Sequence, residues 1–291
     1  MGLVKKNFYK AIKIRYKMFS LVKAIRNLFA RKRIIISFEL NEKNAIAYNR
    51  PSTLNDPEIT ISKKYYLQLQ AISNFDVYTF MLHEKLIKSL LKEVNADALK
   101  EINIAEFGVW KGAWLAFCGL LVKEIQENNM EYSIYGFDTF EGMPFEKINY
   151  NYDTAARSIS ELERSASKLS NTSLYQVESL LEKLGISNFC RLKKGLFDET
   201  IDTIKNKPIT LVHLDADLYE STIFVLKNIY PSIIPGGIIL IDDFYQPTWS
   251  GVTDAVLTFF SDKKEEIRRL SDFLKVRDSN RSRYYALVIK E

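Results

Sequence analysis

Short apolar runs and longer periodic stretches alternate along the chain from about residue 101. The runs have the length of β-strands, whereas apolar residues spaced three and four apart are typical of amphipathic helices. The pattern predicts strands at 102–107, 132–138, 189–194, 209–215, 237–243 and 283–290, and helices at 111–128, 160–184, 218–229 and 249–261. We expect the last strand to pair with a segment near 266–270. Nearly continuous apolar strands indicate a parallel sheet that helices cover on both faces.

The pattern therefore predicts an α/β fold with a doubly wound, mostly parallel sheet in residues 101–291. A different texture precedes it. Residues 1–33 repeat apolar positions in steps of three and four among basic residues, which predicts a basic amphipathic helix as an N-terminal extension. Residues 34–100 are expected to form an accessory, mostly helical segment with a long helix at 74–95. His83 lies on that helix and is assigned no function.

The composition is that of an ordinary globular protein, with 47% hydrophobic and 26% charged residues. Cys118 and Cys190 lie in apolar stretches, which indicates buried, reduced thiols rather than disulfides. No apolar run approaches the ~18 residues that a membrane-spanning helix needs. The N-terminus also lacks the apolar core of a secretory signal. We therefore expect a cytoplasmic protein.

The net charge of +5 is unevenly distributed. Residues 1–33 contain eleven of the 41 basic residues and no Asp or Glu, which leaves 30 basic against 36 acidic residues elsewhere. A basic amphipathic helix can lie on an anionic membrane, here at its inner face. The same pattern fits a helix packed on its own body or on a second subunit, and we expect a homo-oligomer. Because no nucleic-acid-reading module is recognisable, we expect no nucleic-acid partner.

Polar residues gather where the first two predicted strands end. The first strand runs into Glu106, Gly108 and Gly112, whose spacing differs from the Gly-x-Gly-x-x-Gly of dinucleotide-binding turns. Glycines there allow a tight turn and a close approach to a ligand. The second strand ends at Asp138, where a carboxylate can accept hydrogen bonds from ribose hydroxyls or stabilise a turn. A nucleotide-like ligand and two ordinary turns are the alternatives.

Four carboxylates follow the fourth and fifth strands: Asp215, Asp217, Asp242 and Asp243. Because neighbouring parallel strands end at one edge of the sheet, we expect these side chains to lie close together. Carboxylates that meet repel one another unless a cation lies among them, and Mg²⁺ prefers such oxygen ligands. Helix capping is the alternative for one or two of them. His213, inside the fourth strand, is expected to be buried and hydrogen-bonded.

These motifs resemble those of magnesium-dependent sugar O-methyltransferases of the macrocin and mycinamicin type, which are class I methyltransferases. The resemblance covers about residues 101–291 and rests on five motifs in order: EFGVWKG (106–112), FDTFEGMP (137–144), KKGLFDETI (193–201), HLDADLYEST (213–222) and PGGIILIDDF (235–244). It implies a Rossmann-like sheet of seven strands, with S-adenosylmethionine and Mg²⁺ as cofactors. The stretch 145–160, which should help to cover the substrate, resembles no family member and leaves the acceptor unidentified.

The resemblance also implies a role for individual residues. The implied S-adenosylmethionine site consists of Glu106, Gly108, Gly112, Asp138, Gly195 and Phe197, and the implied Mg²⁺ ligands are Asp215, Asp242 and Asp243. Asp138 would hold the ribose of the cofactor. Asp215 would also remove the proton of the acceptor hydroxyl as a general base. Asp217 matches the family pattern without an assigned role.

The expected reaction is in-line methyl transfer to a hydroxyl group of a small-molecule sugar or a glycan, chelated by Mg²⁺. A catechol- or phenol-type O-methyltransferase fits the same metal site. A nicotinamide dehydrogenase shares the fold class, but the glycine spacing and the carboxylates count against it. The third alternative is a non-enzymatic, membrane-associated scaffold that binds S-adenosylmethionine, which the intact aspartates disfavour. If residues 1–33 contact a membrane, the acceptor could be a lipid-linked glycan.

Overall fold

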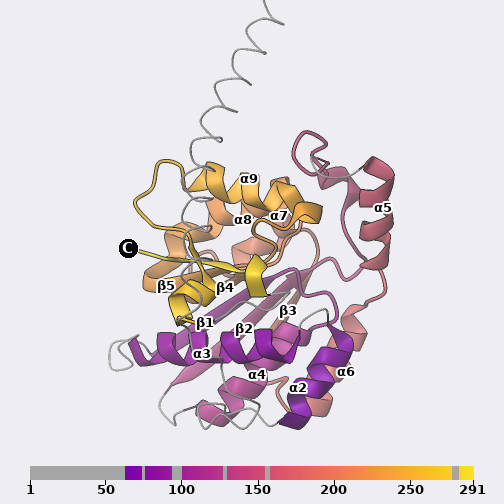
Figure 1. Ribbon diagram of the computed structural model, residues 1–291. Coiled ribbons are helices and arrows are strands. Elements are labelled where there is room, and N and C mark those ends of the chain that lie inside the picture. Colours follow the sequence, from indigo (N-terminus) through magenta and orange to yellow (C-terminus); the bar gives the residue numbers. More distant parts are fainter. Residues whose placement is uncertain (1–62, 74–75, 94–99, 127–129, 155–157, 277–281) are drawn as a thin grey trace, which may run out of the picture. The chain divides into compact units, whose positions relative to one another are not determined.

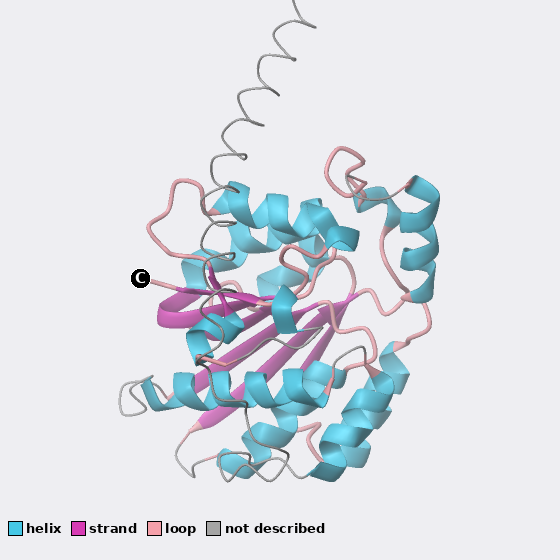
Figure 2. Ribbon diagram, viewed as in Figure 1, coloured by secondary structure: helices cyan, strands magenta, loops and turns pink. Residues whose placement is uncertain are grey.

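The computed structural model describes residues 63–73, 76–93, 100–126, 130–154, 158–276 and 282–291 (Figures 1 and 2). The basic amphipathic helix predicted for residues 1–33 lies outside the described residues, as does the accessory segment before residue 63. In the part of the chain that is described, no helix is both long enough and apolar enough to cross a membrane.

The strands form a seven-stranded sheet in the order β3-β2-β1-β4-β5-β7-β6. They are β1 (Glu101–Phe107), β2 (Glu131–Asp138), β3 (Cys190–Lys194), β4 (Ile209–Leu214), β5 (Ile233–Ile241), β6 (Arg268–Arg269) and β7 (Ala286–Ile289). β1 to β5 pair in parallel, whereas β7 is antiparallel to both β5 and β6. The mostly parallel sheet is confirmed, and so is the pairing of the last strand with a segment near 266–270. The direction of winding reverses between β1 and β4, which is where ligands bind in such sheets.

Helices cover both faces of the sheet, as the strand pattern predicts (Figures 1 and 2). One face carries α2 (Lys63–Ile72), α3 (Val77–Glu93), α4 (Ala113–Ile125), α6 (Leu174–Leu184) and α10 (Leu270–Leu274). The other carries α7 (Phe197–Thr200), α8 (Tyr219–Ile229) and α9 (Ser250–Phe259). The helix α5 (Ile159–Lys168) lies in the connection between β2 and α6. Cys118 and Cys190 are free and buried, as predicted.

The accessory helices α2 and α3 share the core of the sheet. The ring of Phe80 on α3 packs 5.3 Å from the ring of Phe117 on α4. Beside them, the indole Nε1 of Trp114 donates a hydrogen bond of 3.1 Å to Nδ1 of His83, and both side chains are buried. The described part of residues 34–100 therefore buries its apolar faces directly against α4 and the sheet.

The structure corrects one predicted helix. Residues 160–184 form two helices, α5 and α6, because the intervening 169–173 (LSNTS) interrupts them. Ser, Asn and Thr side chains compete with the helix backbone for hydrogen bonds and favour helix ends. Ser173 illustrates this, since its hydroxyl accepts a hydrogen bond from a backbone N–H in the first turn of α6.

Candidate active site

A pocket of about 390 Å³ opens where the parallel strands end. Its lining includes one or more residues that end or follow each of the five strands: Gly108, Asp138, Gly195, Asp215 and Asp243. It therefore spans the point between β1 and β4 at which the winding reverses. Because open α/β sheets bind their ligands at this position, the pocket is the candidate active site.

The turn after β1 requires glycine at residue 108. Gly108 has a φ of +97°, and a Cβ atom there would lie 1.8 Å from the carbonyl oxygen of Asp215. The N–H of Gly108 donates to the carbonyl of Phe137 at 2.9 Å, and the N–H of Asp215 donates to the carbonyl of Phe107 at the same distance. The turn thus lies against the ends of both neighbouring strands, and only glycine fits.

The carboxylate of Asp138 holds this turn in place. Its Oδ2 accepts hydrogen bonds from the backbone N–H groups of Val109 and Trp110, each at 2.8 Å. Its Oδ1 accepts a third from the N–H of Phe140 at 2.6 Å. The hydroxyl of Thr139 lies 3.4 Å from Oδ1 as well, so these neighbours use most of the about four acceptor positions of the carboxylate, which also lines the pocket. Ribose binding stays a prediction.

Trp110 also lines the pocket, and sequence reasoning missed the two hydrogen bonds that hold it in place. Its indole Nε1 donates to Oδ1 of Asn171 at 3.0 Å, and its carbonyl accepts a hydrogen bond from the hydroxyl of Thr172 at 2.5 Å. Both partners belong to the linker between α5 and α6. The polar run SNTS was the available signal, because it interrupts an otherwise helical pattern.

Glu106 lies in the wall of the pocket and is only 2% exposed. Its Oε1 is 3.2 Å from Nδ1 of His213, and the indole of Trp114 stacks on the histidine ring at 4.2 Å. Burial raises the pKa of Glu106 well above its usual range, and the nearby charges of Asp138 and Asp242 act in the same direction. The prediction that His213 is buried and hydrogen-bonded is confirmed.

The other residues of the implied cofactor site occupy different places. Gly195, with a φ of +140°, and Phe197 both line the pocket beyond β3. Gly112 is not among the lining residues. It precedes α4 with a φ of +78°, and a Cβ atom there would lie 2.7 Å from the side chain of Val177 on α6. The structure thus gives Gly112 a role in turning the chain and packing two helices.

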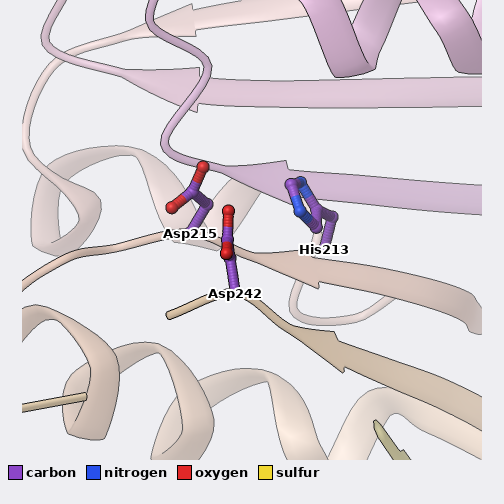
Figure 3. Close-up of side chains that lie close together, drawn as sticks. All are labelled: His213, Asp215 and Asp242. Carbon is purple, nitrogen blue, oxygen red and sulfur yellow. The ribbon is translucent and has the colours of Figure 1, made fainter. Parts of the chain in front are cut away.

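The structure brings together the four carboxylates at the ends of β4 and β5. Side-chain oxygens of Asp215, Asp217 and Asp243 lie within 4.8 Å of one another, and all three residues line the pocket. Asp215 belongs to a second group with Asp242 and His213, whose candidate ligand atoms also lie within 4.8 Å. Figure 3 shows the side chains of this second group projecting to the same side of β4 and β5. Asp215 is therefore common to both groups.

Asp242 lies deeper than the other three carboxylates. It is 1% exposed and is not among the pocket-lining residues. Its Oδ2 accepts a hydrogen bond of 2.8 Å from the hydroxyl of Tyr285, and its Oδ1 accepts one of 2.6 Å from the N–H of Asp243. Asp217 and Asp243 have φ values of +57° and +56°. Such backbone strain at residues other than glycine is concentrated at functional sites.

Glu146 and Lys147, in the segment 145–154, line the pocket. Lys147 forms an ion pair of 2.7 Å with Asp198 of α7. The segment is fastened by Asp153, which is 2% exposed and whose Oδ1 accepts the N–H of Tyr219 at the start of α8 at 2.9 Å. Sequence reasoning missed this contact because its partners are 66 residues apart and share no local pattern.

Comparison with known proteins places these observations in a family. The family model for macrocin O-methyltransferases (TylF) matches residues 78–272. The chain is 28% identical over 143 residues to the 8-demethyl-8-(2,3-dimethoxy-alpha-L-rhamnosyl)-tetracenomycin-C 4'-O-methyltransferase of Streptomyces olivaceus, which covers 49% of this chain and 52% of that protein. It is 26% identical over 146 residues to the mycinamicin III 3''-O-methyltransferase of Micromonospora griseorubida, covering 50% and 56%. The match thus spans about half the length of these curated relatives.

Two solved structures share the architecture. The O-methyltransferase NovP superposes with a TM-score of 0.58 at 21% identity, covering 75% of this chain and 82% of NovP. The calicheamicin methyltransferase CalS11 superposes with a TM-score of 0.54 at 23% identity, covering 84% of this chain and 95% of CalS11. Identities this low show the fold alone, and they confirm the predicted class I, Rossmann-like methyltransferase fold. Because the family model matches more than half of the residues, the chain belongs to the macrocin O-methyltransferase (TylF) family.

Proposed function

We propose that this protein transfers the methyl group of S-adenosylmethionine to a hydroxyl group of a sugar or glycan. One observation carries the proposal: a single pocket joins the glycine-rich turn and Asp138 to the acidic ends of β4 and β5. Family membership supports methyl transfer. Two relatives are named as O-methyltransferases of a rhamnosyl tetracenomycin and of mycinamicin III, which supports a glycoside as the acceptor.

We also propose that the reaction depends on Mg²⁺. The group formed by Asp215, Asp217 and Asp243 offers only carboxylate oxygens, which are the hard ligands that Mg²⁺ prefers. Asp242 is close enough to Asp215 to share a cation with it. Each ligand implied by the family resemblance, Asp215, Asp242 and Asp243, belongs to one of these groups, although Asp243 lies with Asp215 and Asp217 and Asp242 lies with Asp215 and His213. His213 is not counted among the ligands, because Mg²⁺ prefers oxygen ligands to imidazole nitrogen.

Different residues of the chain have different roles in the proposed reaction. When bound, S-adenosylmethionine supplies an electrophilic methyl group and Mg²⁺ polarises the acceptor hydroxyl. Glu106, Asp138 and the turn at Gly108 would hold the cofactor in the part of the pocket that they line. Asp215 takes the hydroxyl proton as the hydroxyl oxygen bonds to the methyl carbon and the carbon–sulfur bond breaks, which leaves S-adenosylhomocysteine. The walls of the pocket hold the reactants in line and exclude water.

The acceptor side of the pocket combines aromatic and acidic side chains. Phe224 and Trp249 line it together with Asp217 and Glu220. Binding sites of this kind bury apolar faces against aromatic rings and orient the ligand with a few polar groups. A sugar has both an apolar face and hydroxyl groups, so this wall suits it. A catechol is the alternative acceptor, because its adjacent oxygens suit the same cation.

Calorimetry with S-adenosylhomocysteine in the presence of Mg²⁺ tests the cofactor. We expect micromolar binding by the wild type and its loss in Asp138→Ala. A folded wild type that does not bind would favour the scaffold alternative. Methyl glycosides and catechols, assayed by the release of S-adenosylhomocysteine, then test the acceptor class. Turnover of catechols alone would overturn the sugar proposal.

The sequence of residues 1–33 supports a further proposal, contact with an anionic membrane by a homo-oligomeric enzyme that acts on a lipid-linked glycan. These residues lie outside the described part of the chain, so the proposal rests on their eleven basic residues and their amphipathic pattern. Co-sedimentation with anionic vesicles should be lost on deletion of residues 1–33. Absence of binding even at low salt would overturn the membrane contact, and light scattering tests the oligomer.

A further inference from the structure

We propose that Tyr285 is a positioning residue of the cation site and acts through Asp242, an inference that rests on the Mg²⁺ dependence proposed above. Its hydroxyl donates a hydrogen bond of 2.8 Å to Oδ2 of Asp242, and each side chain is only 1% exposed. A hydrogen bond to a charged group is strong where water is excluded. Tyr285 lies beyond residues 78–272, which the family model matches, and beyond the last of the five sequence motifs.

The sheet explains how a residue so near the C-terminus reaches the site. β7 runs antiparallel to β5, and Ile241 pairs with Ala286. Continued by one position, this register would set Asp242 opposite Tyr285, in agreement with the hydrogen bond between their side chains. Residues that stand opposite each other on antiparallel strands carry their side chains on the same face. The strand pairing therefore places the hydroxyl of Tyr285 beside the carboxylate of Asp242.

The tyrosine is itself held from two directions. The ring of His83 on α3 contacts the ring of Tyr285 edge-on, with 4.6 Å between centroids. The backbone carbonyl of Tyr285 accepts a hydrogen bond of 3.1 Å from the N–H of Leu270. The accessory helix α3 and the start of α10, neither of which carries a sequence motif, thus hold Tyr285 in place.

One hydroxyl orients two of the proposed ligands. Tyr285 fixes the carboxylate of Asp242, and the other oxygen of that carboxylate accepts the N–H of Asp243 at 2.6 Å. This second bond holds Asp243 in its left-handed conformation, with a φ of +56°. Each oxygen of Asp242 keeps a second lone pair for a cation. Outer partners of metal ligands typically change metal affinity about 10- to 100-fold.

The test compares two buried tyrosines that each donate to a buried carboxylate. Tyr285→Phe removes the bond to Asp242, and Tyr66→Phe removes the equivalent bond to Glu84 between α2 and α3. Binding of Mn²⁺ to the full-length protein is measured by electron paramagnetic resonance, and S-adenosylhomocysteine binding is measured separately without metal. We expect Tyr285→Phe to bind Mn²⁺ about 10-fold more weakly than the wild type. Tyr66→Phe should match the wild type, and neither should change S-adenosylhomocysteine affinity.

Each outcome decides the proposal. Wild-type Mn²⁺ affinity in Tyr285→Phe overturns it, as does equal weakening in Tyr66→Phe, which would indicate a general loosening of the core. Loss of the fold in Tyr285→Phe alone also overturns it, because the hydroxyl would then serve the fold rather than the cation. In an Asp242→Asn background, Tyr285→Phe should have no further effect. A wild type that binds no Mn²⁺ overturns the Mg²⁺ dependence first and the role of Tyr285 with it.

Discussion

In the half of the pocket at the ends of β1 to β3, the carboxylate of Asp138 is already hydrogen-bonded to the protein's own backbone, whereas in the half at the ends of β4 and β5 carboxylates gather beside one another. Asp138 accepts three backbone N–H groups within the first half. In the second half, oxygens of Asp215, Asp217 and Asp243 lie within 4.8 Å of one another. Like charges at such distances repel, and a cation removes the repulsion. The turn in the first half is therefore formed before any ligand arrives, whereas the proposed Mg²⁺ would complete the second half.

We expect the largest loss of stability from a substitution at Gly108, where the two halves of the pocket meet. Gly108→Ala would place a Cβ atom 1.8 Å from the carbonyl oxygen of Asp215, at a φ of +97°. Overpacking and left-handed strain together should lower the free energy of unfolding by about 2–5 kcal/mol. Urea denaturation measures the loss, and binding of both S-adenosylhomocysteine and Mn²⁺ should be lost with it.

Gly236→Ala is the matched control for this substitution. Gly236 has a φ of +80°, but a Cβ atom there would meet nothing within 4 Å. Only the backbone strain of about 1–2 kcal/mol should remain, with both binding activities intact. If the two substitutions lower the free energy of unfolding equally, close packing against Asp215 is not the reason that residue 108 must be glycine.

The next substitution should affect ligand binding in the first half of the pocket and leave the second half unchanged. Asp138→Asn replaces one acceptor oxygen by an NH₂ group that faces a backbone donor. Hydrogen bonds to charged groups contribute about 1.5–3 kcal/mol, so S-adenosylhomocysteine affinity should fall about 10- to 100-fold. Mn²⁺ affinity should not change, because Asp138 is not in either group of candidate ligands. Calorimetry for the one ligand and paramagnetic resonance for the other separate the outcomes. A parallel loss of both would show that the halves are not independent.

A substitution in the second half of the pocket, at the ends of β4 and β5, should have the opposite effect on the two ligands. Asp217→Asn should weaken Mn²⁺ binding about 10-fold while leaving S-adenosylhomocysteine binding unchanged, because one charged oxygen ligand is lost. At a cation concentration 100 times the dissociation constant, the wild type should gain about 2.7 kcal/mol of stability, and the variant should gain less. Asp202→Asn, which removes a surface charge paired with Lys205, is the control and should leave both affinities unchanged. Unaltered Mn²⁺ binding in Asp217→Asn would remove this residue from the candidate ligands.

Sequence reasoning succeeded where the signal is local. Apolar runs located the strands, and the residues that end them, such as Asp138 and Asp215, line the pocket because parallel strands end at one edge. It failed where two distant segments meet. Asp153 and Tyr219 are 66 residues apart, and Tyr285 and Asp242 are 43 apart. Neither contact leaves a periodic pattern, since each depends on how loops and strands pair in three dimensions.

Glu106 offers the smallest but sharpest test of the comparison, because its pKa responds to both halves. Burial raises that pKa well above the ordinary value of 4.5, and the charges of Asp138 and Asp242 raise it further. The folded protein therefore holds a proton that the unfolded chain releases above about pH 4.5. This contribution to stability is complete below that pH and is lost as the pH rises toward the folded-state pKa, by at most about 1.4 kcal/mol per pH unit. Glu106→Gln keeps the shape of the neutral acid and should remove this pH dependence. Urea denaturation of the ligand-free proteins measures the free energy of unfolding. As the pH rises from about 5 to about 8, that free energy should fall less in the variant than in the wild type. Parallel profiles for the two proteins would mean that Glu106 is ionised in the folded state as it is in the unfolded chain.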